Sequence, residues 1–320
     1  MRIAVVGAGA MGSVYAGLLG AAGNEVCVID TWQEHVAAIA EGGLRVEGAS
    51  GDRVVRVGAT TDPASVGVVE LVVIATQARD VRAAAPAPRC LVGPDTVVLP
   101  IQNGLGSSDA VAEVLGEDRV VAGVAGGFGA SVVAPGHVHH HGFELVRLGE
   151  LRGPVTPRLE RIADVWRAAG FTVWTEDDVA RLVWEKAICN VCFSGTCTVL
   201  GRTIGEVLDD PAAWSVASGC AIEAYDVAIA EGVSLGFDDP VAHVEAFGRA
   251  IPGARPSMLL DLEAGRPTEI DAINGAIPPR AAARGLVAPR NETITALVKA
   301  LEAARSADAE RARRATPRTT

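Results

Sequence analysis

The stretch Gly7-Ala8-Gly9-Ala10-Met11-Gly12 follows the apolar run Ile3 to Val6 and decides the fold of this chain. Its glycines have the spacing G-x-G-x-x-G. The first glycine permits a tight turn, the second lets backbone approach a diphosphate, and the third lets the next helix pack on the strand. A helix N-terminus also attracts the diphosphate charge. The motif therefore predicts a dinucleotide-binding loop, and the alternative is a glycine-rich turn in an unrelated strand–helix unit.

Short apolar runs alternate with helical segments through the first half of the chain. The runs lie at residues 1–6, 25–29, 71–75, 96–100 and 119–123, and helical patterns cover 9–22 and 35–42. This alternation predicts buried parallel strands with right-handed crossovers, hence a doubly wound sheet. Residues 131–149 and 171–174 predict further strands that extend the same sheet in the antiparallel sense.

The pattern changes after Thr175, where strand-like runs give way to Ala, Leu, Val and Glu at helical spacing. Asp177 or Asp178 is positioned to cap a long helix. The sequence thus predicts an α/β Rossmann-type N-terminal domain (residues 1–176) followed by an all-α C-terminal domain (residues 177–305). Residues 306–320 are polar and arginine-rich, which predicts a flexible tail.

Composition excludes several classes of protein. The 320 residues carry a formal net charge of -11, which disfavours nucleic acid as a partner. Apolar stretches are interrupted before the roughly 18 residues that a membrane span needs. The six cysteines are sparse and no secretory pattern opens the chain, so we expect a cytoplasmic protein. The apolar helical domain is compatible with a homodimer.

Asp30 ends the second predicted strand, 23 residues after Gly7. A carboxylate at this place accepts hydrogen bonds from the adenosine ribose and repels a 2'-phosphate, so NAD(H) is favoured over NADP(H). Thr31 and Trp32 supply no cation for that phosphate, although Arg53, Arg79 or Arg82 could reach it from other loops. The alternative role for Asp30 is to cap the helix that starts near Gln33.

Two further segments carry candidate site residues. Asn103 follows the strand at 97–99, where open sheets bind ligands, although it could instead be a left-handed turn residue before Gly104. Lys186 and Asn190 share one face of an otherwise apolar helix. A lysine beside a cavity can donate a proton, and partial burial lowers its pKa toward a useful range. The alternative is an ordinary surface lysine beside Glu185.

These segments together resemble the ketopantoate reductase (2-dehydropantoate 2-reductase) family. The resemblance rests on GAGAMG, Gln102 to Gly106, the Lys186 helix, and the stretch from Arg255-Pro256-Ser257-Met258 to Thr268-Glu269-Ile270-Asp271-Ala272-Ile273-Asn274-Gly275. It spans nearly the whole chain in order. It implies a Rossmann domain, a helical domain, and reduction of a small 2-keto acid by a nicotinamide cofactor.

The resemblance also implies roles for individual residues. Lys186 would be the general acid, and Glu269 would lie near the substrate hydroxyl and the cofactor. Ser257 would hold the substrate carboxylate, while Asn103 and Asn190 would orient ligand and lysine. Gln77 stands where members of the family often have a cofactor-loop lysine. From the residues alone, Ser257 would be a helix N-cap and Glu269 a solvated acid.

The family pattern is altered in the pocket that it predicts. Ala254, and by alignment about Ile204, replace asparagines that the family usually carries, which favours a 2-keto acid other than ketopantoate. Two alternative functions are a lysine-dependent 3-hydroxy acid dehydrogenase and a non-catalytic dinucleotide sensor. The segment from Thr268 to Gly275 argues against the first, and the presence of both Lys186 and Glu269 argues against the second.

No metal is expected. His137, His139, His140 and His141 are clustered, and His139 with His141 could share a strand face, but no cysteine or carboxylate accompanies them at ligand spacing. Cys189 and Cys192 form a C-x-x-C on a predicted helix without a second pair, which is typical of buried thiols rather than of a zinc or redox site.

Overall fold

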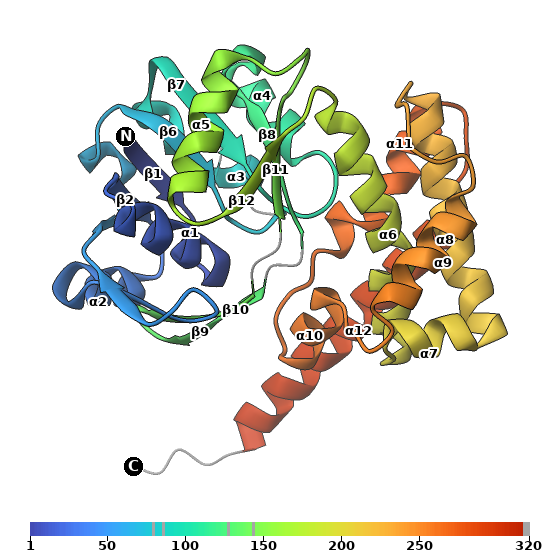
Figure 1. Cartoon of the computed structure of the whole chain (residues 1–320). Helices are drawn as coiled ribbons and strands as arrows, with labels where there is room; N and C mark the ends of the chain where they lie inside the picture. The colour runs from blue at the N-terminus through green and yellow to red at the C-terminus, as the bar shows by residue number, and fades with distance from the viewer. Residues whose placement is uncertain (79–80, 85–86, 127–128, 143–144, 316–320) are drawn as a thin grey trace. The chain divides into compact units, whose positions relative to one another are not determined.

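A computed structural model describes residues 1–78, 81–84, 87–126, 129–142 and 145–315 of the chain (Figure 1). Contacts divide the chain into two compact units, Met1–Ala180 and Arg181–Thr320. The first combines sheets and helices, and the described part of the second contains helices only. The predicted order, an α/β Rossmann-type domain before an all-α domain, is confirmed.

The central sheet of the first unit is parallel, with strand order β5-β2-β1-β6-β7. Its strands are β1 (Arg2–Val6), β2 (Glu25–Ile29), β5 (Gly58–Thr60), β6 (Val69–Ile74) and β7 (Val92–Pro100). Val5 lies opposite Val28 on one side and Val73 on the other, and all three are fully buried. Covering both faces of a parallel sheet requires such continuous apolar strands.

Helices connect these strands and cover the sheet (Figure 1). The helical segments of this unit are α1 (Ala10–Ala21), α2 (Gln33–Gly42), η1 (Pro63–Ser65), α3 (Val81–Ala84), η3 (Ala87–Leu91), α4 (Ser107–Leu115), η4 (Glu117–Arg119) and α5 (Pro157–Ala168). Tyr15 of α1 packs against Trp166 of α5 and against Phe171, with ring centroids 5.1 and 6.0 Å away. These aromatic contacts hold α1, the helix that follows the glycine loop, against the core.

A second sheet corrects the prediction for residues 131–142. It has the order β4-β3-β10-β9, made of β3 (Leu44–Gly48), β4 (Arg53–Val55), β9 (Gly129–Ala134) and β10 (His137–Gly142). Strand β10 pairs antiparallel with β9 but parallel with β3, about 90 residues earlier in the chain. The hairpin therefore joins β3, which the sequence analysis did not predict, and does not extend the central sheet.

The remaining strands form a third sheet, β12-β11-β8, from β8 (Val121–Gly126), β11 (Leu145–Glu150) and β12 (Thr172–Thr175). Strand β11 is antiparallel to β8, but β12 is parallel to β11. Among the described residues, an isolated parallel bridge between Val98 and Val120 links this sheet to β7. The parallel pairing predicted for residues 119–123 is limited to that bridge.

The second unit is built from α6 (Val179–Leu200), α7 (Ile204–Asp209), α8 (Pro211–Ala230), α9 (Pro240–Ala250), α10 (Ser257–Glu263), η5 (Ile270–Ala272), η6 (Asn274–Ala276), α11 (Ile277–Ala283) and α12 (Pro289–Ala315). Side chains of Thr203, Asp210 and Asp239 cap the N-termini of α7, α8 and α9. These caps satisfy amides that a helix start leaves unpaired. Helix α12 continues past Ser306 to Ala315, so most of the segment predicted as a tail is helical.

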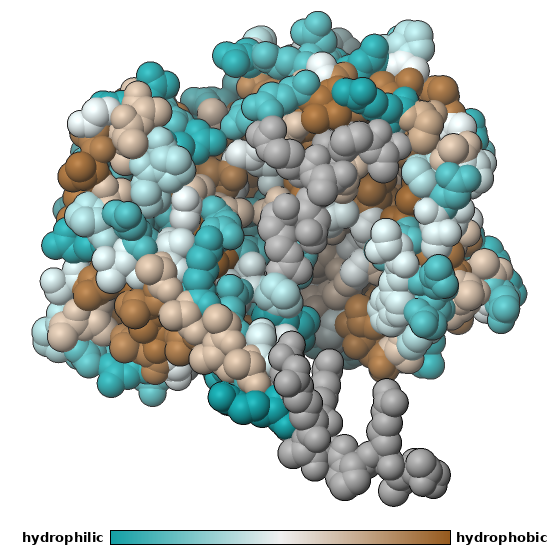
Figure 2. Space-filling model, turned by 180° about the vertical axis from the view of Figure 1, so that it is seen from behind, coloured by the Kyte–Doolittle hydropathy of each residue, from teal (hydrophilic) through white to brown (hydrophobic). Residues whose placement is uncertain are grey.

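On the face shown in Figure 2, hydrophobic and hydrophilic residues are interspersed. Among the described residues, no helix is both long enough and apolar enough to cross a membrane.

Candidate active site

The glycine loop has the geometry that its spacing predicts. Gly7 has φ 96°, and a Cβ there would lie 2.7 Å from the amide nitrogen of Thr76. A Cβ at Gly12 would lie 1.9 Å from the carbonyl oxygen of Gly7, so α1 packs directly on the turn. A Cβ at Gly9 would meet nothing within 4 Å, and Gly9 caps α1 without a side chain. The backbone amides at this helix start are therefore accessible to an anionic group.

Asp30 binds the same loop. One carboxylate oxygen accepts a 2.5 Å hydrogen bond from the amide of Ala8, and the other accepts a 2.8 Å bond from the amide of Trp32. The residue that caps α2 is Trp32, without a side-chain hydrogen bond, so the alternative role of Asp30 as the cap of this helix is wrong. Asp30 instead joins the glycine loop to the end of β2.

Three loops meet at the carboxyl edge of the central sheet. The amide of Gln102 donates to the carbonyl oxygens of Ile74 (2.5 Å) and Thr76 (3.2 Å), which anchors the β7 loop to the β6 loop. Asn103 is half-buried in this loop, and Gly104, not Asn103, has a positive φ. The left-handed alternative for Asn103 is therefore wrong.

Buried oxygens at this edge have no hydrogen-bond partner among the described residues: Thr76 Oγ1, Gln77 Oε1 and Gln102 Oε1. Unpaired buried polar atoms are costly and call for an explanation, of which a bound ligand is one. They adjoin the glycine loop, since a Cβ at Gly7 would touch Thr76. The residues present thus fit a dinucleotide. Arg79 and the side chain of Arg82 lie outside the described residues, and Arg53 on β4 donates to the carbonyl of Ser50.

In the second unit, α6 carries Lys186 half-buried among apolar neighbours, with Ala187, Ile188 and Val191 buried. Burial lowers the pKa of Lys186 to about 8, and the negative charge of Glu269 opposes that shift. The structure therefore brings Lys186 and Glu269, 83 residues apart in sequence, into electrostatic contact. Such a lysine is not an ordinary surface cation, and it holds a proton that it can release near neutral pH.

Buried amides hold the segment of Glu269 against α6. Asn274 donates to the carbonyl oxygen of Val191 (2.8 Å) and to the side chain of Asn291 (2.9 Å). Asn291 donates to Glu223, whose carboxylate also accepts the amides at the start of α12. Sequence reasoning missed this network. The sequence feature that could have predicted it is the presence of Asn274 and Asn291 in helical, apolar surroundings, where a buried side-chain amide needs a hydrogen-bond partner.

The remaining predicted residues are also in the second unit. Asn190 is half-buried one turn after Lys186, and Ser257 is exposed at the first position of α10. The capping residue of α10 is Pro256, so the N-cap alternative for Ser257 is wrong. Glu269 is half-buried rather than fully solvated. The amide of Ile204 donates to the carbonyl of Ala254 (3.0 Å), which brings the two altered family positions together.

The histidine cluster differs from the prediction in one respect. The carboxylate of Glu47 on β3 lies 3.0 Å from Nε2 of His137 and 3.5 Å from Nδ1 of His139. A carboxylate therefore does accompany these histidines. The rings of His139 and His141 lie 4.8 Å apart, which confirms the shared strand face. Among the described residues, no group of three or more His, Cys, Asp or Glu side chains has the geometry to hold a metal ion. Cys189 and Cys192 are buried, and burial raises the pKa of both thiols.

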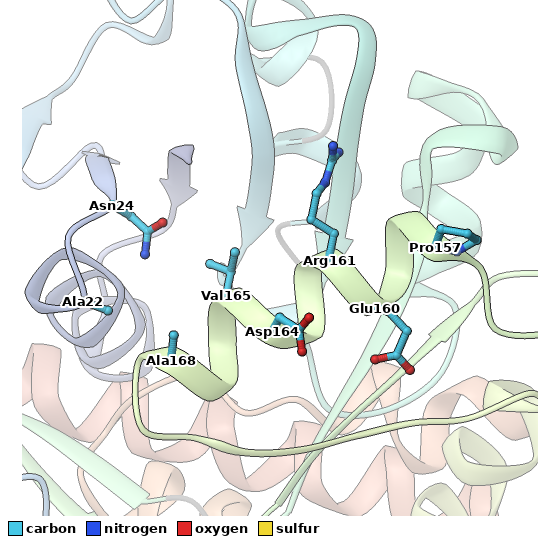
Figure 3. Close-up of a pocket in the computed structure, with 8 residues that line it drawn as sticks. All are labelled: Ala22, Asn24, Pro157, Glu160, Arg161, Asp164, Val165 and Ala168. Carbon is cyan, nitrogen blue, oxygen red and sulfur yellow. The ribbon is translucent and has the colours of Figure 1, made fainter.

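A surface pocket of about 550 Å³ lies in the first unit, between the end of α1 and α5. Figure 3 shows the residues that line it. Ala22 and Asn24 line one side, and α5 residues from Pro157 to Ala168 line the other. None of the predicted site residues lines this pocket. Its rim holds Glu160, Arg161 and Asp164, which are typical of a solvated helix face.

A glycine-rich loop at the carboxyl edge of a parallel sheet, together with a half-buried lysine–carboxylate pair on an all-helical unit, defines a two-domain dinucleotide-dependent oxidoreductase. Residues 3–153 match the family described as "Ketopantoate reductase PanE/ApbA", and residues 178–302 match its C-terminal domain. The chain belongs to the ketopantoate reductase family.

Relatives match along almost the entire chain. The 2-dehydropantoate 2-reductase of Pyrococcus abyssi is 33% identical over 95% of this chain and 98% of its own, and that of Halobacterium salinarum is 30% identical over 93% and 98%. Among solved structures, a PanE/ApbA family ketopantoate reductase from Ralstonia eutropha has a TM-score of 0.86 at 33% identity, covering 96% of this chain and all of its own. A D-mandelate dehydrogenase with NADH and anilino(oxo)acetate has a TM-score of 0.85 at 29% identity, covering 96% and 99%.

Proposed function

We propose that this protein reduces a 2-keto acid to the 2-hydroxy acid with a reduced nicotinamide dinucleotide, with NADH favoured over NADPH. The observation that carries the proposal is Lys186, whose pKa of about 8 is set by burial and by Glu269. Curated relatives named 2-dehydropantoate 2-reductase support the reaction class.

The first domain, residues 1–176, holds the cofactor in this proposal. The amides from Gly7 to Gly12 would hold its diphosphate, Asp30 would accept hydrogen bonds from its adenosine ribose, and Gln77 and Asn103 would line the rest of the cofactor site. The unpaired buried oxygens beside the loop support this assignment. The bound cofactor supplies a hydride to the keto carbon.

The second domain, residues 177–305, supplies the acid and the substrate contacts. Lys186 gives its proton to the C2 oxygen as negative charge develops there, and its ammonium stabilises that charge. Glu269 keeps the lysine protonated near neutral pH and contacts the cofactor and the substrate hydroxyl. Asn190 orients the lysine, and Ser257 binds the substrate carboxylate.

The altered family positions support a substrate class within this proposal. Ala254 has no side-chain amide, and Ile204 is 4% exposed and packs within the helical unit. One missing hydrogen bond to a substrate hydroxyl costs about 0.5–1.5 kcal/mol. The similarity to a D-mandelate dehydrogenase supports an apolar keto acid, because mandelate is a 2-hydroxy acid with a phenyl side chain.

We therefore expect keto acids with apolar side chains, phenylglyoxylate and branched aliphatic ones among them, to equal or exceed ketopantoate in kcat/KM. The measurement is a panel of 2-keto acids with NADH and NADPH, followed by the loss of reduced-cofactor absorbance. Ketopantoate as clearly the best substrate would contradict the substrate class but not the reaction. No oxidation of either cofactor with any keto acid would contradict the proposed function.

The pH dependence provides a test that involves Glu269. Protonated Lys186 is the active form in reduction, so kcat/KM should be level below the pKa of about 8 and fall as the pH rises through it. The charge of Glu269 raises this pKa, so Glu269→Gln should move the falling limb to lower pH. In the oxidation direction the neutral amine is required, and the rate should rise over the same range. If the falling limb of the kcat/KM profile stays at the same pH in Glu269→Gln, then Glu269 does not influence the pKa of Lys186.

A further inference from the structure

Beside Asp30, an exposed aromatic ring is supported by a buried polar network. The indole of Trp32 is 37% exposed and stacks on the ring of His35, with centroids 4.7 Å apart and planes 14° apart. His35 itself is fully buried. The indole thus has one face covered by the imidazole, while the residue as a whole stays exposed.

Hydrogen bonds hold His35 in one orientation. Its Nδ1 accepts the amide of Gly136 at 3.0 Å, so the proton of the neutral ring is on Nε2. That Nε2–H donates to the hydroxyl of Ser13 (3.1 Å), which in turn donates to the carbonyl of Ala8 (2.9 Å). Burial lowers the pKa of His35, which keeps the ring neutral and preserves the bond from Gly136.

The network closes on the glycine loop from both sides. Ala8 donates its amide to Asp30 and accepts the hydroxyl of Ser13 at its carbonyl, while Asp30 accepts the amide of Trp32. The loop, the carboxylate and the indole are therefore fixed relative to one another within the first unit. A ring that is held in this way loses little conformational entropy when a flat group stacks on it.

We propose that the indole of Trp32 is the stacking surface for the adenine of the dinucleotide, with His35 as the positioning residue behind it. This inference rests on the proposed function, in which Asp30 binds the adenosine ribose, and the adenine is attached to that ribose. Trp32 is two residues beyond Asp30 and bonded to the same carboxylate. Every adenine has an aromatic face, so stacking adds affinity whether or not the ribose is phosphorylated.

The test is calorimetric binding of ADP-ribose, which contains adenine but no nicotinamide, to the full-length protein. Trp32→Leu should weaken binding roughly 5- to 100-fold, the range for losing a base–aromatic stack. Trp32→Phe keeps an aromatic face and should remain closer to the wild type. Trp174→Leu is the matched control, because Trp174 is a 53% exposed tryptophan on β12 of the same unit.

Fluorescence gives a second readout. ADP-ribose should quench part of the indole emission of the wild type, and that part should be missing from Trp32→Phe. Equal ADP-ribose affinity in the wild type and Trp32→Leu would overturn the inference and leave dinucleotide binding intact. Failure of the wild type to bind ADP-ribose, NADH and NADPH would instead overturn the proposed function and this inference with it.

Discussion

Replacing Lys186 with alanine should lower kcat for keto-acid reduction by about 10²- to 10⁴-fold, the usual contribution of a positioned acid–base group. The substitution removes both the proton for the C2 oxygen and the charge that opposes the developing alkoxide. Cofactor affinity should change little, because the predicted diphosphate site lies on Gly7 to Gly12. Steady-state kinetics and cofactor titration by fluorescence measure the two effects separately.

Two further variants show which property of the lysine matters. Lys186→Arg keeps the charge, but a guanidinium has a pKa far above neutrality and cannot give up its proton at neutral pH, so kcat should stay low. Lys299, the chain's other lysine, forms a surface ion pair with Asp271 at 2.5 Å, and Lys299→Ala should turn over like the wild type. Near-normal kcat in Lys186→Ala would eliminate lysine acid catalysis and require another proton donor.

The wild type should use NADH with about tenfold or greater advantage in kcat/KM over NADPH, which corresponds to about 1.4 kcal/mol of discrimination. The carboxylate of Asp30 repels a 2'-phosphate and accepts ribose hydroxyls. Asp30→Ala should narrow the gap between the cofactors. The substitution should also weaken the binding of both cofactors, because the amides of Ala8 and Trp32 lose their acceptor. The measurement is kcat/KM for each cofactor at saturating keto acid.

Asp30→Asn distinguishes charge from hydrogen bonding. It removes the negative charge while keeping one acceptor near the loop, so the preference should narrow with a smaller loss of affinity than in Asp30→Ala. Arg53→Ala is the control for a remote cation, since Arg53 is exposed on β4 and donates a hydrogen bond to the carbonyl of Ser50. It should leave the cofactor preference unchanged. A wild type that prefers NADPH tenfold would show that the interpretation of Asp30 is wrong.

The sequence by itself determined the fold class and the principal elements of the first domain. The glycine spacing and the buried apolar runs are local signals, and β1, β2, β6 and β7 lie where those runs predict. The helical spacing likewise predicted the all-α unit and the helix of Lys186. Strands β3, β4 and β5 were missed because they are short and partly exposed, with no continuous apolar run.

Only the tertiary structure decided how the candidate residues interact. The pKa of Lys186 depends on burial and on Glu269, 83 positions away, and no local pattern reports desolvation. Asn274 reaches the carbonyl of Val191 across the same interval of chain. The bond from Ala8 to Asp30 joins segments 22 residues apart, and the amide of Gly136 fixes His35 from 101 residues away. Periodicity specifies which face of an element is buried, whereas hydrogen bonds and charge interactions across the fold depend on which elements that face meets.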